Sequence, residues 1–128
     1  MPQIPVISII DDDASVRVAT HNLIRSLGYT VHTFASADEF LRSPELNDTS
    51  CVIADVQMPA MSGIDLAARL RNRDSDIPII LITGYPDENI LEKAAAAGIY
   101  HVLLKPHLEE SLLSHIRGAI QESHPASR

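Results

Sequence analysis

The feature that most constrains the fold is a regular alternation between short strand-like runs and stretches with helical periodicity. Strand-like runs occupy Val6–Ile10, Thr30–Phe34, Cys51–Ala54, Ile79–Ile82 and Val102–Leu104. Four of these runs are nearly continuous in apolar residues, which is typical of parallel strands covered on both faces. We interpret the run Thr30–Phe34 as alternating between polar and apolar residues, the pattern of a half-exposed strand, and therefore expect it at an edge of the sheet.

Helical periodicity fills the intervals between these runs. We expect a first helix over residues 14–27, ended by Gly28, and a second over 37–42, ended at Ser43 because Pro44 follows. A third helix begins after the cap residue Ser62. A fourth runs from about Asp87 to Gly98, and a fifth covers 108–121. The predicted buried faces use Val16, Ala19, Leu23, Ile24 and Leu27 in the first helix, and Ile90, Leu91, Ala94 and Ala95 in the fourth.

Strands that alternate with helices predict an α/β fold with a doubly wound parallel sheet. Right-handed crossovers and an edge position for the second strand favour the flavodoxin-like (βα)5 arrangement with strand order 2-1-3-4-5. In this arrangement a ligand site lies beside the first strand, at the carboxyl ends of the strands.

Composition narrows the class of protein further. The chain has 128 residues, which suits one domain, placed at 1–121, with 122–128 as a tail or the start of a linker. A formal net charge of −7 makes direct binding of nucleic-acid phosphates unfavourable, so DNA contact would need a separate output domain. The apolar runs are too short to span a membrane, and the single cysteine, Cys51, suits the reducing cytoplasm. The histidines lack metal-site spacing, so we expect solvated or core histidines.

Polar residues follow the predicted strands where each strand ends. Asp11 and Asp12 follow the first run, Asp55 the third, Thr83 the fourth and Lys105 the fifth. Adjacent carboxylates after a buried strand are unfavourable on their own, because like charges repel and burial removes solvent. A hard cation such as Mg²⁺, which prefers oxygen ligands, makes the arrangement favourable. The ordinary alternative, a helix cap, accounts for one acid, Asp13, and not for three.

Together these residues have a clear chemical use. A carboxylate can attack a phosphoryl group and form an acyl phosphate. Mg²⁺ would offset the charge, Lys105 would pair with a phosphoryl oxygen, and Thr83 would donate a hydrogen bond. Each residue alone has a commonplace structural role, as a cap, a strand end or a solvated charge. Their coincidence at matching strand ends predicts a phosphoryl-transfer site.

At these residues the chain resembles the receiver domain of two-component response regulators, and is similar to receivers of helix-turn-helix transcriptional regulators. The resemblance rests on Asp55-Val-Gln-Met-Pro-Ala-Met-Ser-Gly63, Ile82-Thr83-Gly84 and Leu104-Lys105-Pro106. It implies that Asp55 accepts phosphate from a phosphohistidine on a sensor histidine kinase or phosphotransfer protein. It also implies that Asp12, Asp55 and the Gln57 backbone carbonyl bind Mg²⁺ directly and that Asp11 acts mainly through water. Gly63 would permit close packing, Gly84 would leave room for the phosphoryl group, and Pro106 would follow a cis peptide bond.

The same resemblance implies a switch rather than an enzyme that turns over a separate substrate. Phosphorylation would shift the face formed by the fourth helix, fifth strand and fifth helix, and so control transcription through another domain or a phosphorelay partner. This face could also form a homodimer. Two residues depart from the family pattern: Val102 replaces an aromatic residue coupled to the threonine, and His107 replaces a common phenylalanine.

Two alternatives remain open at the level of sequence. An aspartyl-phosphate phosphotransferase or phosphatase would place its nucleophile and a second acid two residues apart, as Asp11 and Asp13 are. Such an enzyme also needs a substrate-holding cap, for which we expect no room in 128 residues. A receiver-shaped module that works without phosphate is the other alternative, and the complete set of polar strand-end residues argues against it.

Overall fold

The chain forms one parallel five-stranded sheet. The computed structural model describes residues 4–73, 75–84, 88–99, 101–104 and 109–123. Its strands are β1 (Val6–Ile10), β2 (Thr30–Phe34), β3 (Cys51–Asp55), β4 (Ile79–Thr83) and β5 (His101–Leu104). Their order, β2-β1-β3-β4-β5, with every neighbouring pair parallel, is the order predicted from the sequence.

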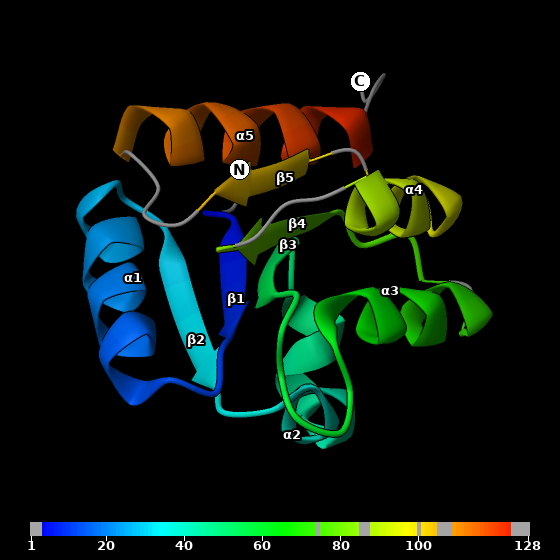
Figure 1. Ribbon diagram of the computed structural model, residues 1–128. Coiled ribbons are helices and arrows are strands. Elements are labelled where there is room, and N and C mark those ends of the chain that lie inside the picture. Colours follow the sequence, from blue (N-terminus) through cyan, green and yellow to red (C-terminus); the bar gives the residue numbers. More distant parts are fainter. Residues whose placement is uncertain (1–3, 74, 85–87, 100, 105–108, 124–128) are drawn as a thin grey trace.

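Helices cover both faces of this sheet. They are α1 (Ala14–Ser26), α2 (Ala37–Arg42), α3 (Gly63–Asn72), α4 (Glu88–Ala96) and α5 (Glu109–Ser123). Helices α1 and α5 lie on one face, and α2, α3 and α4 lie on the other (Figure 1). The structure adds a 3₁₀ helix, η1 (Pro44–Asp48), that we did not predict. Ser43 ends α2 as expected, and its side chain then caps η1 by accepting the Glu45 N–H.

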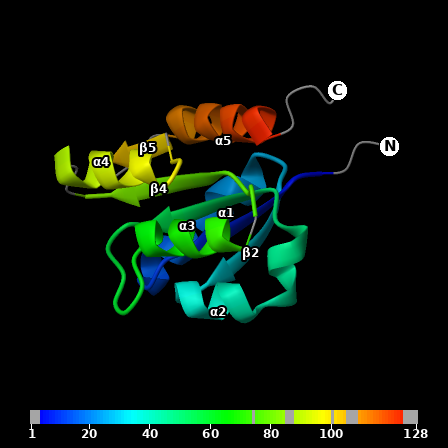
Figure 2. The same ribbon diagram turned by 90° about the vertical axis from the view of Figure 1, so that its right-hand side faces the viewer.

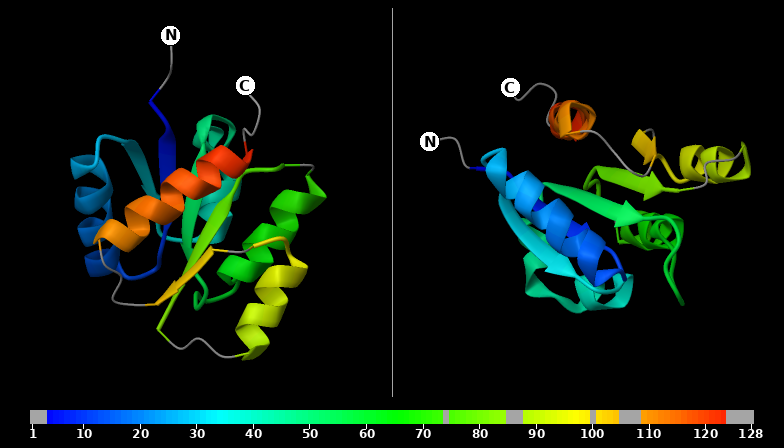
Figure 3. Two further views of the ribbon diagram at one scale, coloured as in Figure 1. Left: turned by 90° about the horizontal axis from the view of Figure 1, so that it is seen from above. Right: turned by 60° about the vertical axis from the view of Figure 1, so that its left-hand side comes forward.

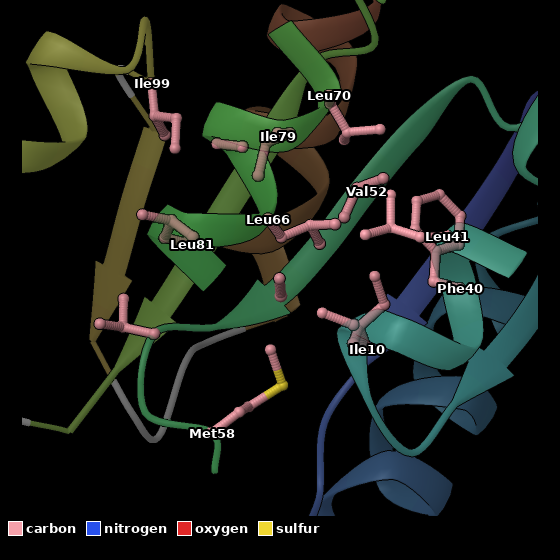
Figure 4. Packing of buried hydrophobic residues seen from close by; sticks show 14 of the residues in the cluster. Ile10, Phe40, Leu41, Val52, Met58, Leu66, Leu70, Ile79, Leu81 and Ile99 are labelled. Carbon is pink, nitrogen blue, oxygen red and sulfur yellow. The ribbon is translucent and has the colours of Figure 1, made fainter. Parts of the chain in front are cut away.

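Two apolar layers hold the strands in place. Along β3, Cys51 and Ile53 belong to the layer under α1 and α5, whereas Val52 and Ala54 belong to the layer under α2, α3 and α4. This alternation follows from the two-residue period of a strand. Figure 4 shows the second layer, in which side chains from the helices meet side chains from β1, β3 and β4. Because both faces are covered, the strand ends are held in fixed relative positions.

The edge strand β2 has the predicted position but a different side-chain arrangement. Val31 packs towards the α1 and α5 layer, and Phe34 is buried in the other layer. Residues three apart on a strand point to opposite faces, so the strand supplies one apolar side chain to each layer. Its partial exposure therefore reflects its place at the edge.

Two predicted helix faces need correction. In α1 the buried residues are Thr20 and Ile24, and Ala19 is exposed at the margin of the buried stripe. In α4 only Ala94 is buried, and Leu91 is 50% exposed. Ala95 is exposed as well. Helix α4 lies at the β5 edge of the sheet, where fewer neighbours are available to cover its outer half (Figure 1). Within the described ranges, we find no helix with the length and apolar character needed to cross a bilayer.

Candidate functional site

Strand register brings the polar strand-end residues together. Ile10 pairs with Ala54, so Asp11 and Asp55, which follow them, lie side by side. Asp55 pairs with Ile82, so Thr83 lies one residue further along the neighbouring strand. Asp11 and Asp55 are only 4% and 5% exposed, and Thr83 is fully buried. The predicted convergence of Asp11, Asp55 and Thr83 is therefore present in the fold.

Three carboxylates form the centre of the site. One oxygen from each of Asp11, Asp12 and Asp55 lies within 4.8 Å of the other two. Two of these side chains are buried and Asp12 is exposed, so the cluster opens to solvent on one side. Like charges at this spacing repel, and burial increases the penalty. An all-oxygen donor set open to water fits Mg²⁺, which keeps several water ligands.

Short-range hydrogen bonds orient these carboxylates. Asp11 Oδ1 accepts the Asp13 N–H at 2.9 Å, and Asp55 Oδ1 accepts the Gln57 N–H at 2.9 Å. Side-chain bonds to the backbone two residues ahead are the usual device for fixing an Asp rotamer in a turn. The site therefore has a preset carboxylate geometry, and Gln57 takes part in it through its backbone.

The third acid of the run has a structural role. Asp13 is the N-cap of α1, and its Oδ1 accepts the N–H groups of Ser15 and Val16. This confirms the capping interpretation for that residue. A carboxylate engaged in this way does not supply the second acid that the phosphatase alternative requires of Asp13.

Arg17 contributes to the site, although we did not select it from the sequence. Its Nη1 donates to the Asp11 backbone carbonyl at 2.7 Å, across the first turn of α1. The guanidinium places a positive charge beside the loop that carries the carboxylates and anchors that loop to the helix. The sequence does contain a signal for this role, because Arg17 is a cationic residue one helical turn after the run of acids.

The loop between β3 and α3 packs tightly against the end of β3. Figure 2 shows this green loop projecting past the carboxyl ends of the strands. A Cβ atom on Gly63 would lie 2.7 Å from the Asp55 carbonyl oxygen and 2.8 Å from Leu81 Cδ2. The predicted close packing at Gly63 is thus confirmed. Ser62 caps α3 as expected, in a capping box with Asp65.

The same loop contains a strained turn. Ala60 has φ of 68°, and it is the only non-glycine residue with positive φ in the described part of the chain. The Met61 N–H donates to the Pro59 carbonyl at 2.7 Å, which closes a three-residue γ-turn around Ala60. Positive-φ γ-turns are rare and strained for residues with a Cβ atom. Nothing in the residue type marked this position in advance.

Of the other residues that we expected to matter, Gly84 and Val102 lie in the described part of the chain and the rest do not. Gly84 follows Thr83 and is exposed, and a Cβ atom there would meet nothing within 4 Å. Val102 packs against the layer under α2, α3 and α4. Lys105, Pro106 and His107 lie outside the described residues, so the lysine contact and the cis peptide bond remain predictions.

Comparison with known proteins identifies relatives along nearly the whole chain. Residues 7–117 match the family described as response regulator receiver domain. The chain is 42% identical over 116 residues to the response regulator protein TodT of Pseudomonas putida, covering 91% of this chain and 51% of TodT. It is 34% identical over 122 residues to the transcriptional regulatory protein FixJ of Bradyrhizobium diazoefficiens, covering 95% of this chain and 60% of FixJ. The chain thus spans about half the length of the curated relatives it matches.

A solved structure gives the same picture of the fold. The chemotaxis protein CheY4 of Vibrio cholerae superposes with a TM-score of 0.85 at 25% identity, covering 91% of this chain and 99% of CheY4.

Proposed function

The chain belongs to the response regulator receiver domain family, and on that premise we propose that it is a phosphorylation-dependent signalling switch in which Asp55 is the phosphoryl acceptor. The observation that carries the proposal is the cluster of Asp11, Asp12 and Asp55 at the strand ends, with buried Thr83 on the neighbouring strand. The donor would be a phosphohistidine on a sensor histidine kinase or a phosphotransfer protein.

The residues of the cluster fit a magnesium ion. Asp12, Asp55 and the Gln57 carbonyl would hold Mg²⁺ directly, and Asp11 would act mainly through water. When bound, Mg²⁺ would offset the carboxylate charge and position the phosphoryl oxygens. Exposed Asp12 leaves the cluster open on the side from which a hydrated ion would enter.

Phosphoryl transfer would proceed through the protein's own side chains. An Asp55 carboxylate oxygen attacks phosphorus, the P–N bond to the donor imidazole breaks, and its electron pair remains on the imidazole nitrogen. The product is an acyl phosphate on Asp55. Thr83 donates a hydrogen bond to a phosphoryl oxygen, Lys105 balances the charge, and exposed Gly84 leaves open space beside Thr83. The domain assists its own phosphorylation and hydrolysis and turns over no separate substrate.

The output would pass through the face formed by α4, β5 and α5. Leu91 on α4 is 50% exposed and Leu104 on β5 is 53% exposed, which leaves two large apolar side chains available to a partner or to a second copy. Phosphate on Asp55 would bias a two-state packing of this face.

We further propose that residues 1–121 form the receiver domain and that 122–128 are a tail or the start of a linker. We place the protein in the cytoplasm. The chain covers 51% of TodT and 60% of FixJ, and FixJ is named a transcriptional regulatory protein. An output domain for transcription is therefore the favoured partner, with DNA contacted only through that domain. The alternative is a stand-alone receiver that passes phosphate to a phosphorelay partner. CheY4, of which the chain covers 99%, is a protein of this size.

The acceptor is tested by intact mass after incubation with Mg²⁺ and acetyl phosphate. We expect the wild type to gain one labile phosphoryl group and Asp55→Asn to gain none. Asp13→Asn is the matched control. The substitution removes a neighbouring carboxylate that has no part in the transfer, and the new asparagine can still cap α1. Phosphorylation of Asp55→Asn, or none in a folded wild type with either acetyl phosphate or phosphorylated kinase, would refute the assignment.

The metal site is tested separately by thermal unfolding with increasing Mg²⁺. A ligand at one hundred times its Kd stabilises the native state by about 2.7 kcal/mol. We expect the wild type and Asp13→Asn to gain stability in this way and Asp12→Asn to gain far less. Equal gains in all three proteins would contradict a site that uses Asp12.

A further inference from the structure

Two histidines outside the carboxylate site are in direct contact. His101 is the first residue of β5 and His115 lies in the middle of α5. Their Nδ1 atoms are 2.9 Å apart, and the rings are perpendicular with centroids 5.1 Å apart. The sequence predicts only solvated or core histidines, so this pairing is a property that the fold adds.

The geometry requires a proton between the two rings. The centroid separation is about the N–N distance plus the two ring radii, so each Nδ1 points at the other. A neutral imidazole has one N–H and one lone pair, and the contact needs a donor on one ring and an acceptor on the other. If both rings become imidazolium, both Nδ1 atoms carry hydrogen and both rings carry positive charge. The contact then cannot persist.

The surroundings of the pair make it sensitive to that change. Helix α5 runs alongside β5 (Figure 3), and a Cβ atom on Gly118 would lie 3.7 Å from His101 Cε1, so the helix passes close to the His101 ring. The neighbouring strand β4 has no ionisable side chain. The charged residues of α4, which are Glu88, Glu92 and Lys93, belong to a helix on the opposite face of the sheet and are exposed. On α5, Arg117 is exposed, two residues beyond His115.

We propose that His101 and His115 form a pH-sensitive latch that joins β5 to α5. With at most one extra proton on the pair, an N–H···N bond links the strand to the helix. Addition of the second proton breaks the bond and loosens the helix from the strand. Because β5 and α5 belong to the proposed output face, acidification would alter that face. This last consequence rests on the proposed function, whereas the latch itself does not.

The direction of the pH effect follows from linkage. Burial, and secondarily the charge of His101, lowers the pKa of His115 below its ordinary value of 6.5. On acidification the unfolded chain therefore binds this proton before the folded chain does. The stability associated with His115 is present above pH 6.5 and is lost as the pH falls from 6.5 towards the lowered pKa.

A titration of the wild type tests the latch directly. Ring ¹⁵N shifts would be recorded by NMR from about pH 8 to pH 5, where histidine titrates, with EDTA present so that no metal bridges the rings. We expect the His115 ring to take up its proton below the ordinary value of 6.5, and the Nδ1 shifts of both rings to change together in that step. His21→Gln, on α1, is the matched control and should leave this step unchanged. Protonation of His115 at its ordinary value, with no accompanying change in the Nδ1 shift of His101, would overturn the proposal.

Hydrogen exchange supplies a second readout that concerns the helix. After correction for intrinsic exchange rates, we expect protection of the α5 amides to fall severalfold between about pH 7.5 and pH 5.5 in the wild type. In His115→Gln the protection should be nearly independent of pH. Equal protection at both pH values in the wild type would refute the latch. Both experiments omit Mg²⁺ and phosphoryl donors, so their failure would leave the assignment of Asp55 untouched, and the reverse also holds.

Discussion

Replacement of Gly63 by alanine should destabilise the fold and displace the acceptor strand. The added Cβ atom would lie 2.7 Å from a backbone oxygen of Asp55 and 2.8 Å from Leu81. The oxygen belongs to the last residue of β3 and cannot rotate away as a flexible side chain could. Gly63 does not have positive φ, so the steric contact, and not backbone strain, is the reason for glycine here.

The size of the effect follows from two opposing contributions. Overpacking a well-packed interior costs about 1–3 kcal/mol, and the double contact at Gly63 places it towards the upper part of that range. Alanine is favoured over glycine in a helix by up to about 1 kcal/mol, although Gly63 is only the first residue of α3. We expect a net loss of about 1.5 kcal/mol in the free energy of unfolding, equivalent to a fall in Tm of roughly 5 °C.

The assay is urea denaturation of Gly63→Ala beside Gly118→Ala. The second substitution lies within α5, where a Cβ atom meets its nearest neighbour at an ordinary 3.7 Å. The control should therefore gain up to about 1 kcal/mol from helix propensity alone. A Gly63→Ala protein as stable as Gly118→Ala would show that the loop relaxes freely, and the argument from close packing would fail.

Three further predictions follow from particular contacts. Ala60→Gly should raise the free energy of unfolding by about 0.5–1 kcal/mol, because relief of the positive φ outweighs the added freedom of the unfolded chain. Thermal unfolding would detect this gain, and a loss of stability would contradict the strained turn. Thr49→Val should cost about 1–3 kcal/mol, because Ser8 loses the 2.7 Å hydrogen bond that its buried hydroxyl makes with Thr49. The double variant Ser8→Ala/Thr49→Val should recover part of that loss in chemical denaturation, and additive losses would argue against the pairing. Burial raises the pKa of the Cys51 thiol to about 12, so its reaction with a maleimide at neutral pH should be slow until the chain unfolds; fast labelling of the folded protein would contradict this.

The parts of the fold that could be predicted are those set by repeated local patterns. Continuous apolar runs in β3 and β4 require cover on both faces, and this requirement leads to a doubly wound parallel sheet. The site followed from the same reasoning, because parallel strands bring Asp11, Asp55 and Thr83 to one edge. Gly28 ended α1 with φ of 99°, as a helix-terminating glycine should.

The parts that could not be predicted depend on contacts between elements or on backbone geometry. Helical periodicity alone did not exclude Leu91 from the buried face, because exposure depends on where α4 lies relative to the sheet edge. His101 and His115 are neighbours only because α5 packs alongside β5. Ala60 adopts a conformation that its residue type disfavours, so the rest of the loop must impose it.

The position of the site depends on the core more than on the polar residues themselves. Asp55 is adjacent to Asp11 because Ile10 pairs with Ala54, and that pairing is set by apolar side chains on both faces of β1 and β3. A shift of one residue in either strand would exchange the two faces and move its apolar residues out of their layers. The free energy of the two apolar layers thus opposes any register that would separate the carboxylates. The core that fixes the ends of β1 and β3 therefore also holds the three carboxylates close together against their mutual repulsion.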